Sequence, residues 1–184
     1  LEYVLKQNGL NPENDVKMVT NVDFTATAGA FKSGIGDYVA LFEPTATMLE
    51  KDGAGNIVSS IGNEAGNISY TCFYTTKSYM DENPDIIQKF TNAIYKGQQW
   101  VQQHTSEEVA DSIISFFPGT DKEVIVKVID NYKNIEAYSE TPEVSEDGLN
   151  KLMDIIQGYD ESLITERPDF NIIVNNSFAK QAIK

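Results

Sequence analysis

The stretch Gly36-Asp37-Tyr38-Val39-Ala40-Leu41-Phe42-Glu43-Pro44-Thr45 decides the expected fold. The near-continuous apolar run over residues 38–42 is typical of a strand that is buried on both faces, as in a parallel sheet. Proline is favoured at the first position of a helix, so a helix is predicted directly after it, over residues 45–51. A buried strand followed at once by a helix is the repeating unit of an α/β fold, and we predict this strand to be the most buried one.

Short helical and extended patterns alternate on both sides of this stretch. The apolar spacing and the turn residues predict helices over residues 1–8 and 26–32, and strands over residues 16–20 and 57–61. Helices and strands that alternate at short spacing indicate a parallel sheet covered by helices. Residues 1–69 are therefore predicted to form one α/β lobe.

The remainder of the chain has a different pattern and is predicted to be mostly helical. A strand rich in Thr, Tyr and Phe is expected over residues 70–76. Asn83, Pro84 and Asp85 supply a cap, a first-position proline and an acid, so a helix is predicted from there to about residue 103. Further helix starts are predicted at Thr105, Thr120, Ser145 and either Asn176 or Ser177.

Composition excludes several classes of function. The 184 residues are 41% apolar, enough for a core, and carry 14 basic against 28 acidic side chains, a net charge of −14. Such a surface repels phosphate backbones, so nucleic acid is not an expected partner. Cys72 and His104 are single copies, which excludes an intrachain disulfide and a Cys/His zinc cluster. No nucleophile elbow, phosphate-binding loop or dinucleotide fingerprint occurs, so we predict no catalytic residue, metal or cofactor.

Polar side chains follow two of the predicted strands. The carboxyl ends of parallel strands meet at one edge of a sheet, where ligands usually bind. We therefore predict a small-molecule site in which Phe24 or Tyr74 stacks on a ring and Glu43 accepts a hydrogen bond from an amino group or a cation. Three hydroxyls complete the predicted set: Thr25, Thr27 and Thr45. The alternative interpretation is that Glu43, Thr25 and Thr45 are ordinary helix caps.

Three phrases, in this order and spacing, resemble one known family. They are Gly29-Ala30-Phe31-Lys32-Ser33-Gly34-x-Gly36-Asp37-Tyr38-Val39, Leu41-Phe42-Glu43-Pro44-Thr45-Ala46 and Tyr79-x-x-x-Asn83-Pro84-Asp85-Ile86-Ile87-Gln88-Lys89-Phe90-x-x-Ala93-Ile94. Together they are similar to the solute-binding proteins of ABC importers of the nitrate/sulfonate/taurine type, which include the thiamine-pyrimidine (NMT1/THI5-like) binders. The resemblance extends over most of the chain.

The resemblance implies a type II periplasmic-binding-protein fold, with two α/β lobes joined by crossover strands. Residues 1–69 would then belong to the second lobe, and residues 70–184 would supply a crossover strand and the helical C-terminal portion of the first lobe. The N-terminal half of that first lobe would be absent, so the chain is expected to be a fragment that binds solute weakly or not at all. The implied partners are a small-molecule ligand and an ABC permease. The whole protein is expected to be monomeric and extracytoplasmic, either periplasmic or a membrane-anchored lipoprotein.

The ligand class and the general function both have alternatives. Arg167 is the only arginine, so an anionic ligand finds little countercharge, which favours a neutral or cationic heteroaromatic such as a pyrimidine over nitrate or a sulfonate. Helix N-termini can nevertheless hold anions. A pyrimidine-biosynthesis enzyme of the same superfamily and a helical protein-interaction module are the alternatives to the importer component.

Overall fold

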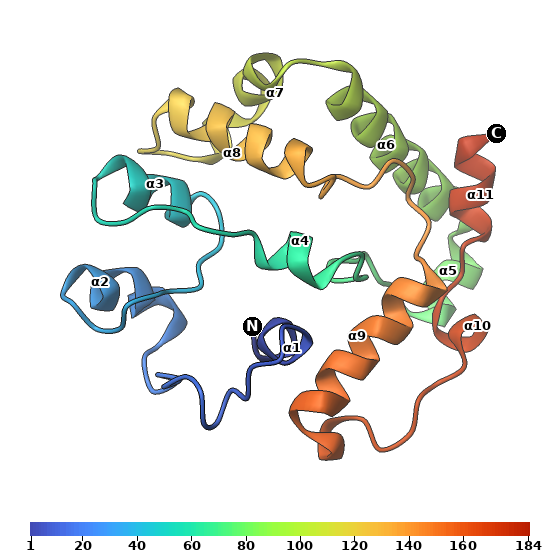
Figure 1. The fold of residues 1–184 in the computed structure, drawn as a ribbon. Coiled ribbons are helices and arrows are strands. Elements are labelled where there is room, and N and C mark those ends of the chain that lie inside the picture. Colours follow the sequence, from blue (N-terminus) through green and yellow to red (C-terminus); the bar gives the residue numbers. More distant parts are fainter. The chain divides into compact units, whose positions relative to one another are not determined.

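A computed structural model describes residues 1–184 and shows a chain that folds as two compact units. Unit 1 comprises residues 1–65 and 106–135, and unit 2 comprises residues 66–105 and 136–184. The secondary structure is helical throughout, with eleven α-helices and three short 3-10 helices (Figure 1). The first boundary lies close to the predicted one at residue 69, but residues 106–135 return to the first unit. The assignment of these ranges to two lobes stays a prediction.

Unit 1 is built around the helices α7 and α8. Its helices in chain order are α1 (Glu2–Gln7), η1 (Phe24–Ala26), α2 (Thr27–Lys32), α3 (Thr45–Lys51), α4 (Ile61–Ala65), α7 (Ser106–Ile113), η2 (Ile114–Phe116) and α8 (Lys122–Asn134). In Figure 1, α7 packs on α8 and α3 lies along α8. The apolar residues of α8 recur on one face, which turns toward these neighbours. The buried apolar side chains of the three helices are Leu49, Val109, Ala110, Val124, Ile125, Val128 and Ile129.

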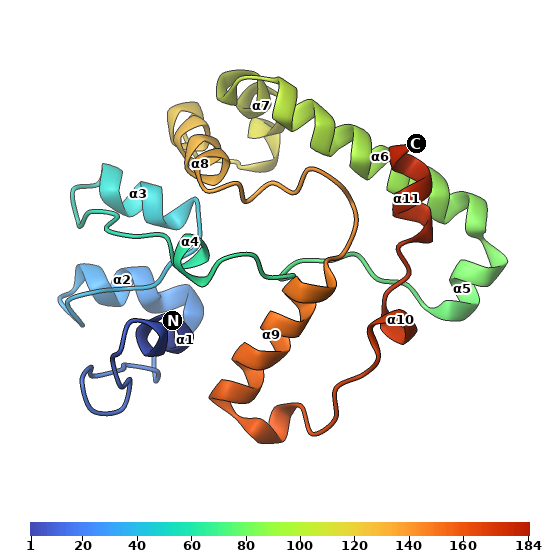
Figure 2. The ribbon, with the colours of Figure 1, turned by 45° about the vertical axis from the view of Figure 1, so that its right-hand side comes forward.

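Unit 2 is organised by the long helix α6. Its helices are α5 (Lys77–Glu82), α6 (Pro84–Gln103), α9 (Glu146–Tyr159), η3 (Glu161–Leu163), α10 (Phe170–Ile173) and α11 (Ser177–Ile183). Figure 2 shows α11 against α6, where the Gln88 amide donates to the backbone carbonyl of Phe178 at 3.0 Å. Farther along α6, glutamine amides donate to three backbone carbonyls of the non-helical segment that precedes α9. These pairs are Gln98 with Thr141, Gln99 with Glu140, and Gln102 with Tyr138.

Helix α9 begins where its cap residue predicts. The Ser145 hydroxyl accepts a hydrogen bond from the Gly148 backbone N–H at 3.2 Å. Ser69 docks on the same turn, because its backbone N–H donates to the Gly148 carbonyl at 3.1 Å. A Cβ at Gly148 would lie 2.8 Å from the Ser69 hydroxyl oxygen, so only glycine permits this approach. The predicted cap and the predicted start of the helix are confirmed.

The start of α6 is also as predicted, but the Asn83 side chain does not cap it. Its amide donates backward to the Tyr79 carbonyl at 3.1 Å, in the helix that precedes it. Asn83 is both the last cap of α5 and the first cap of α6, and its side chain hydrogen-bonds to α5. The backbone carbonyl of Asn83 instead accepts from the N–H groups of Ile86 and Ile87. The prediction of a side-chain cap at this position was wrong.

No β-strand forms in residues 1–184, so the predicted parallel sheet is not confirmed. The four segments predicted as strands, residues 16–20, 38–42, 57–61 and 70–76, contain no paired strand. Tyr38 is 81% exposed, so the prediction of a strand buried on both faces at this position was wrong. A run of apolar residues favours an extended backbone locally, but a strand exists only where neighbouring strands accept its backbone hydrogen bonds.

Candidate functional site

The two loops that were predicted to hold the ligand lie next to each other in unit 1. The ring of Phe24, in η1, meets the ring of Phe42 edge to face, with centroids 5.6 Å apart and an interplanar angle of 61°. Phe24 is 63% exposed and Phe42 is 53% exposed, so the pair presents aromatic surface to solvent. Edge-to-face contact is a favourable arrangement for two aromatic rings, and it ties together the loops before α2 and α3.

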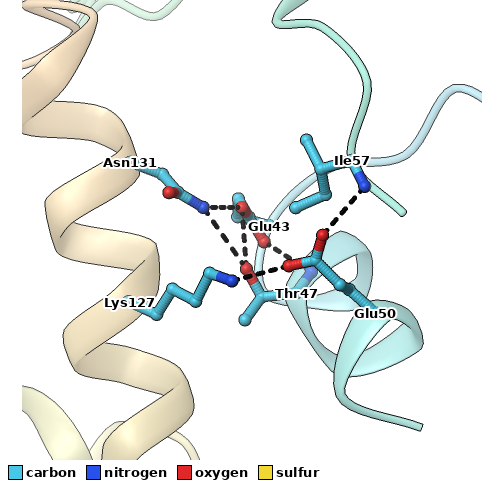
Figure 3. A network of polar contacts seen from close by, with 6 residues as sticks. All are labelled: Glu43, Thr47, Glu50, Ile57, Lys127 and Asn131. Atoms are coloured by element: carbon cyan, nitrogen blue, oxygen red, sulfur yellow. Dashed lines mark hydrogen bonds and ion pairs between the residues drawn. The ribbon is translucent and has the colours of Figure 1, made fainter. Parts of the chain in front are cut away.

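Glu43 follows Phe42 and is held in a network of polar contacts (Figure 3). Its Oε1 accepts from the Thr47 hydroxyl at 2.9 Å and from the Asn131 side-chain amide at 2.9 Å. Its Oε2 accepts from the Thr47 backbone N–H at 3.0 Å. Thr47 is only 3% exposed, so the carboxylate binds a buried part of α3. We call Glu43, Thr47 and Asn131 the Glu43 network.

The Glu43 network gives partial support to the alternative interpretation of this residue. The bond from the Thr47 N–H satisfies one of the backbone donors that a helix start leaves without an intrahelical partner. Glu43 therefore performs a capping task for α3. A carboxylate can accept about four hydrogen bonds, and the Glu43 carboxylate accepts three within the network, which leaves room for one more, on Oε2.

The part of the network that lies on α8 was not predicted from the sequence. Asn131 is 88 residues from Glu43 in the chain, and no local pattern connects them. Tyr132, the next residue, also interacts with the Glu43 backbone, and burial raises the pKa of its phenol above the usual value. Two consecutive residues of α8 thus support the loop that carries Glu43. The four-residue spacing of Glu43 and Thr47 is the one sequence signal that could have predicted part of this arrangement.

A second polar contact joins the same two helices. Lys127 of α8 pairs with Glu50 of α3 at 2.6 Å, and the other oxygen of Glu50 accepts from the Ile57 backbone N–H at 3.0 Å (Figure 3). The Lys127 ammonium, followed by the Ile57 N–H, holds the pKa of the Glu50 carboxyl below its usual value. The Lys127 ammonium, which lies beside the Glu43 network in Figure 3, is therefore already paired with a carboxylate.

The predicted hydroxyl residues are less closely associated with Glu43. The Thr27 hydroxyl donates to the Phe24 carbonyl at 2.8 Å, within its own turn. Thr25 and Thr45 are exposed, and neither makes a side-chain cap bond to α2 or α3. Tyr74 belongs to unit 2, where it is 95% exposed. The structure thus places Phe24 beside Phe42 and next to the Glu43 loop, while the ligand roles of all six residues stay predictions.

Other kinds of site have little support in the structure. No group of three or more His, Cys, Asp or Glu side chains could hold a metal ion. None of the helices has the length and apolar character that crossing a bilayer requires. A small pocket lies at the opposite end of α3 from Glu43, between Met48, Asp52, Thr120 and Val124. The Lys51–Asp121 ion pair, at 2.5 Å, lies in its wall.

Comparison with known proteins assigns the family. The sequence model of the NMT1-like family matches residues 1–115. The chain belongs to this family. The NMT1-like family has a periplasmic-binding-protein fold, so the fold class implied by the resemblance holds for the family, although no sheet is seen in residues 1–184. The match includes Phe24, Glu43 and Thr47, whereas α8 lies outside it.

A similar protein extends the comparison beyond residue 115. The chain is 40% identical over 180 residues to a Bacillus subtilis (strain 168) protein named "Putative binding protein YtlA". The match covers 98% of this chain and 53% of that protein, so the chain spans about half the length of this relative. No solved structure matches.

Proposed function

We propose that this chain is part of the substrate-binding component of an ABC importer, which captures a solute between two lobes and delivers it to a membrane permease. The observation that carries the proposal is the half-buried carboxylate of Glu43, which follows an exposed aromatic pair and keeps one acceptor position. Small-molecule sites typically combine a small number of precisely placed polar groups with aromatic surface. The proposed location is extracytoplasmic, and the proposed whole protein is a monomer without a catalytic step of its own.

The charges of the chain favour a neutral or cationic heteroaromatic ligand. Arg167 is the only arginine, and in unit 2 it pairs with Asp154 at 2.6 Å and donates to Gln157. In unit 1, Lys127 pairs with Glu50. A ligand with an amine, such as an aminopyrimidine, would place its ring against Phe24 or Phe42 and its N–H toward Glu43. Nitrate or a sulfonate would instead place negative charge next to that carboxylate.

The proposal is tested by removing the charge of Glu43. Calorimetry with an aminopyrimidine on the whole protein should show that Glu43→Gln weakens binding by about 1.5–3 kcal/mol, roughly tenfold or more, because a charged hydrogen bond is lost. Glu13→Gln, an exposed acid of the same unit, is the matched control and should bind as the unchanged protein does. Equal affinity of Glu43→Gln and the unchanged protein would restrict Glu43 to its capping task and refute the ligand role.

A further inference from the structure

The two oxygens of the Glu43 carboxylate accept different numbers of hydrogen bonds. Oε1 accepts two hydrogen bonds, from the Thr47 hydroxyl and from the Asn131 amide, which fills both of its lone-pair directions. Oε2 accepts one, from the Thr47 backbone N–H. One acceptor position therefore remains, and it lies on Oε2. A bidentate partner such as an amidinium needs one acceptor position on each oxygen, and Oε1 has none to offer while Asn131 and Thr47 keep their bonds.

The donors that cause this asymmetry are firmly held. Thr47 is buried on α3, so its hydroxyl has little freedom to turn away. Asn131 lies on α8, two residues after Ile129 and three after Val128, which are buried in the core of unit 1. The Lys127–Glu50 ion pair joins the same two helices one turn earlier on α8. Neighbouring contacts on rigid elements reduce the freedom of a side chain to move when a ligand arrives.

We propose that Asn131, together with Thr47, is a positioning and specificity-determining residue that leaves Glu43 a single acceptor position. The site then selects ligands that offer one N–H donor over ligands that offer a bidentate amidinium or guanidinium. This inference rests on the proposed function, in which Glu43 faces the solute. It assigns a role to a helix that lies outside the residues matched by the family.

Two probes with the same ring and different donor geometry test the inference. An aminopyrimidine offers one amine, and a pyrimidine carboxamidine offers two parallel N–H groups. The variants are Asn131→Leu and Thr47→Val, each of which removes one donor to Oε1 and keeps a side chain of similar size. Asn134→Leu is the matched control, because Asn134 is an exposed asparagine on the same helix. Helix content by circular dichroism establishes which variants are folded. One folded donor variant, Asn131→Leu or Thr47→Val, suffices for the comparison.

The quantity to compare is the ratio of the two dissociation constants in the whole protein, measured by calorimetry. Both donor variants should shift this ratio roughly tenfold toward the carboxamidine, since each frees an acceptor position on Oε1. Asn134→Leu should leave the ratio unchanged. A merely structural role of Asn131 would weaken both probes alike.

The outcomes separate this inference from the function on which it rests. If the unchanged protein binds the aminopyrimidine and the ratio stays constant in a folded donor variant, the role of Asn131 and Thr47 is overturned and the solute-binding site at Glu43 stands. If neither probe binds the unchanged protein, the proposed site itself is overturned, and the inference with it. A tenfold shift in a donor variant, absent from Asn134→Leu, is the expected result.

Discussion

At the scale of single residues, carboxylates join the helices of unit 1. Glu50 receives a hydrogen bond from the Ile57 backbone and forms an ion pair with Lys127, so one side chain connects three segments. The lowered pKa of this carboxyl means that the folded chain favours its charged form more than the unfolded chain does. The stability that it contributes is complete above the usual Glu value of 4.5 and is lost as the pH falls through the lowered folded-state value.

Replacing Glu50 should therefore have an effect that depends on pH. Glu50→Gln is expected to reduce the free energy of unfolding near neutral pH by up to about 1 kcal/mol, because the ion pair is partly exposed. The difference from the unchanged chain should vanish once acid has protonated Glu50. Urea unfolding is measured at neutral pH and at a pH low enough to protonate Glu50. It can be followed on the methyl resonances of Ile125 and Ile129, which are buried in the same unit. Glu13→Gln is the control, and an equal loss of stability at both pH values would contradict the role of the charge.

The candidate site could be predicted only where the signal was local. Glu43 and Phe24 were identified by their positions just before helix starts, and the structure places the rings of Phe24 and Phe42 in contact. Asn131 could not be predicted, because its contact with Glu43 joins residues 88 positions apart. Tyr74 lies in unit 2, in a segment predicted as a strand that does not form in residues 1–184, and its ligand role stays a prediction.

At the scale of elements, helices were predicted well and strands were not. The helices α3 and α6 begin and end as predicted and α9 begins as predicted, because caps, prolines and the apolar period act within a few residues. Asn83 is a partial exception, since its side chain had a nearer acceptor in α5. Strands differ from helices in this respect, because their stability depends on neighbouring strands that the local sequence does not specify.

The cap of α9 gives a test at this scale. Ser145→Ala removes the hydroxyl that accepts from the Gly148 N–H and should lower the free energy of unfolding by about 1 kcal/mol. The methyl resonance of Met153, buried on α9, reports unfolding of this helix directly. Ser139→Ala, at an exposed serine of the same unit, should have almost no effect. A Ser145→Ala variant as stable as the control would show that the cap bond contributes nothing.

At the scale of the whole molecule, apolar side chains remain exposed on the extended segments. Tyr38, Ile57 and Val58 are all exposed, although their sequence is typical of buried strands. The chain spans about half the length of its Bacillus relative, and its family has a periplasmic-binding-protein fold, which contains sheets. The apolar pattern of these segments is typical of strands, but residues 1–184 contain no sheet.

Amide hydrogen exchange can establish whether these segments are strands that await pairing. In the 184-residue chain, the amides of Val39, Ala40 and Leu41 should exchange almost as fast as in an unfolded peptide, because no strand is formed there. The amides of Val128 and Ile129, inside α8, should be protected and serve as the internal reference. Adding the part of the Bacillus protein that lies outside the match should slow exchange at residues 39–41, since strands of the family fold would then have neighbours. Protection at residues 39–41 in the chain alone would mean that the sheet forms without that part, and no change on its addition would mean that these apolar residues are not strands of the family fold.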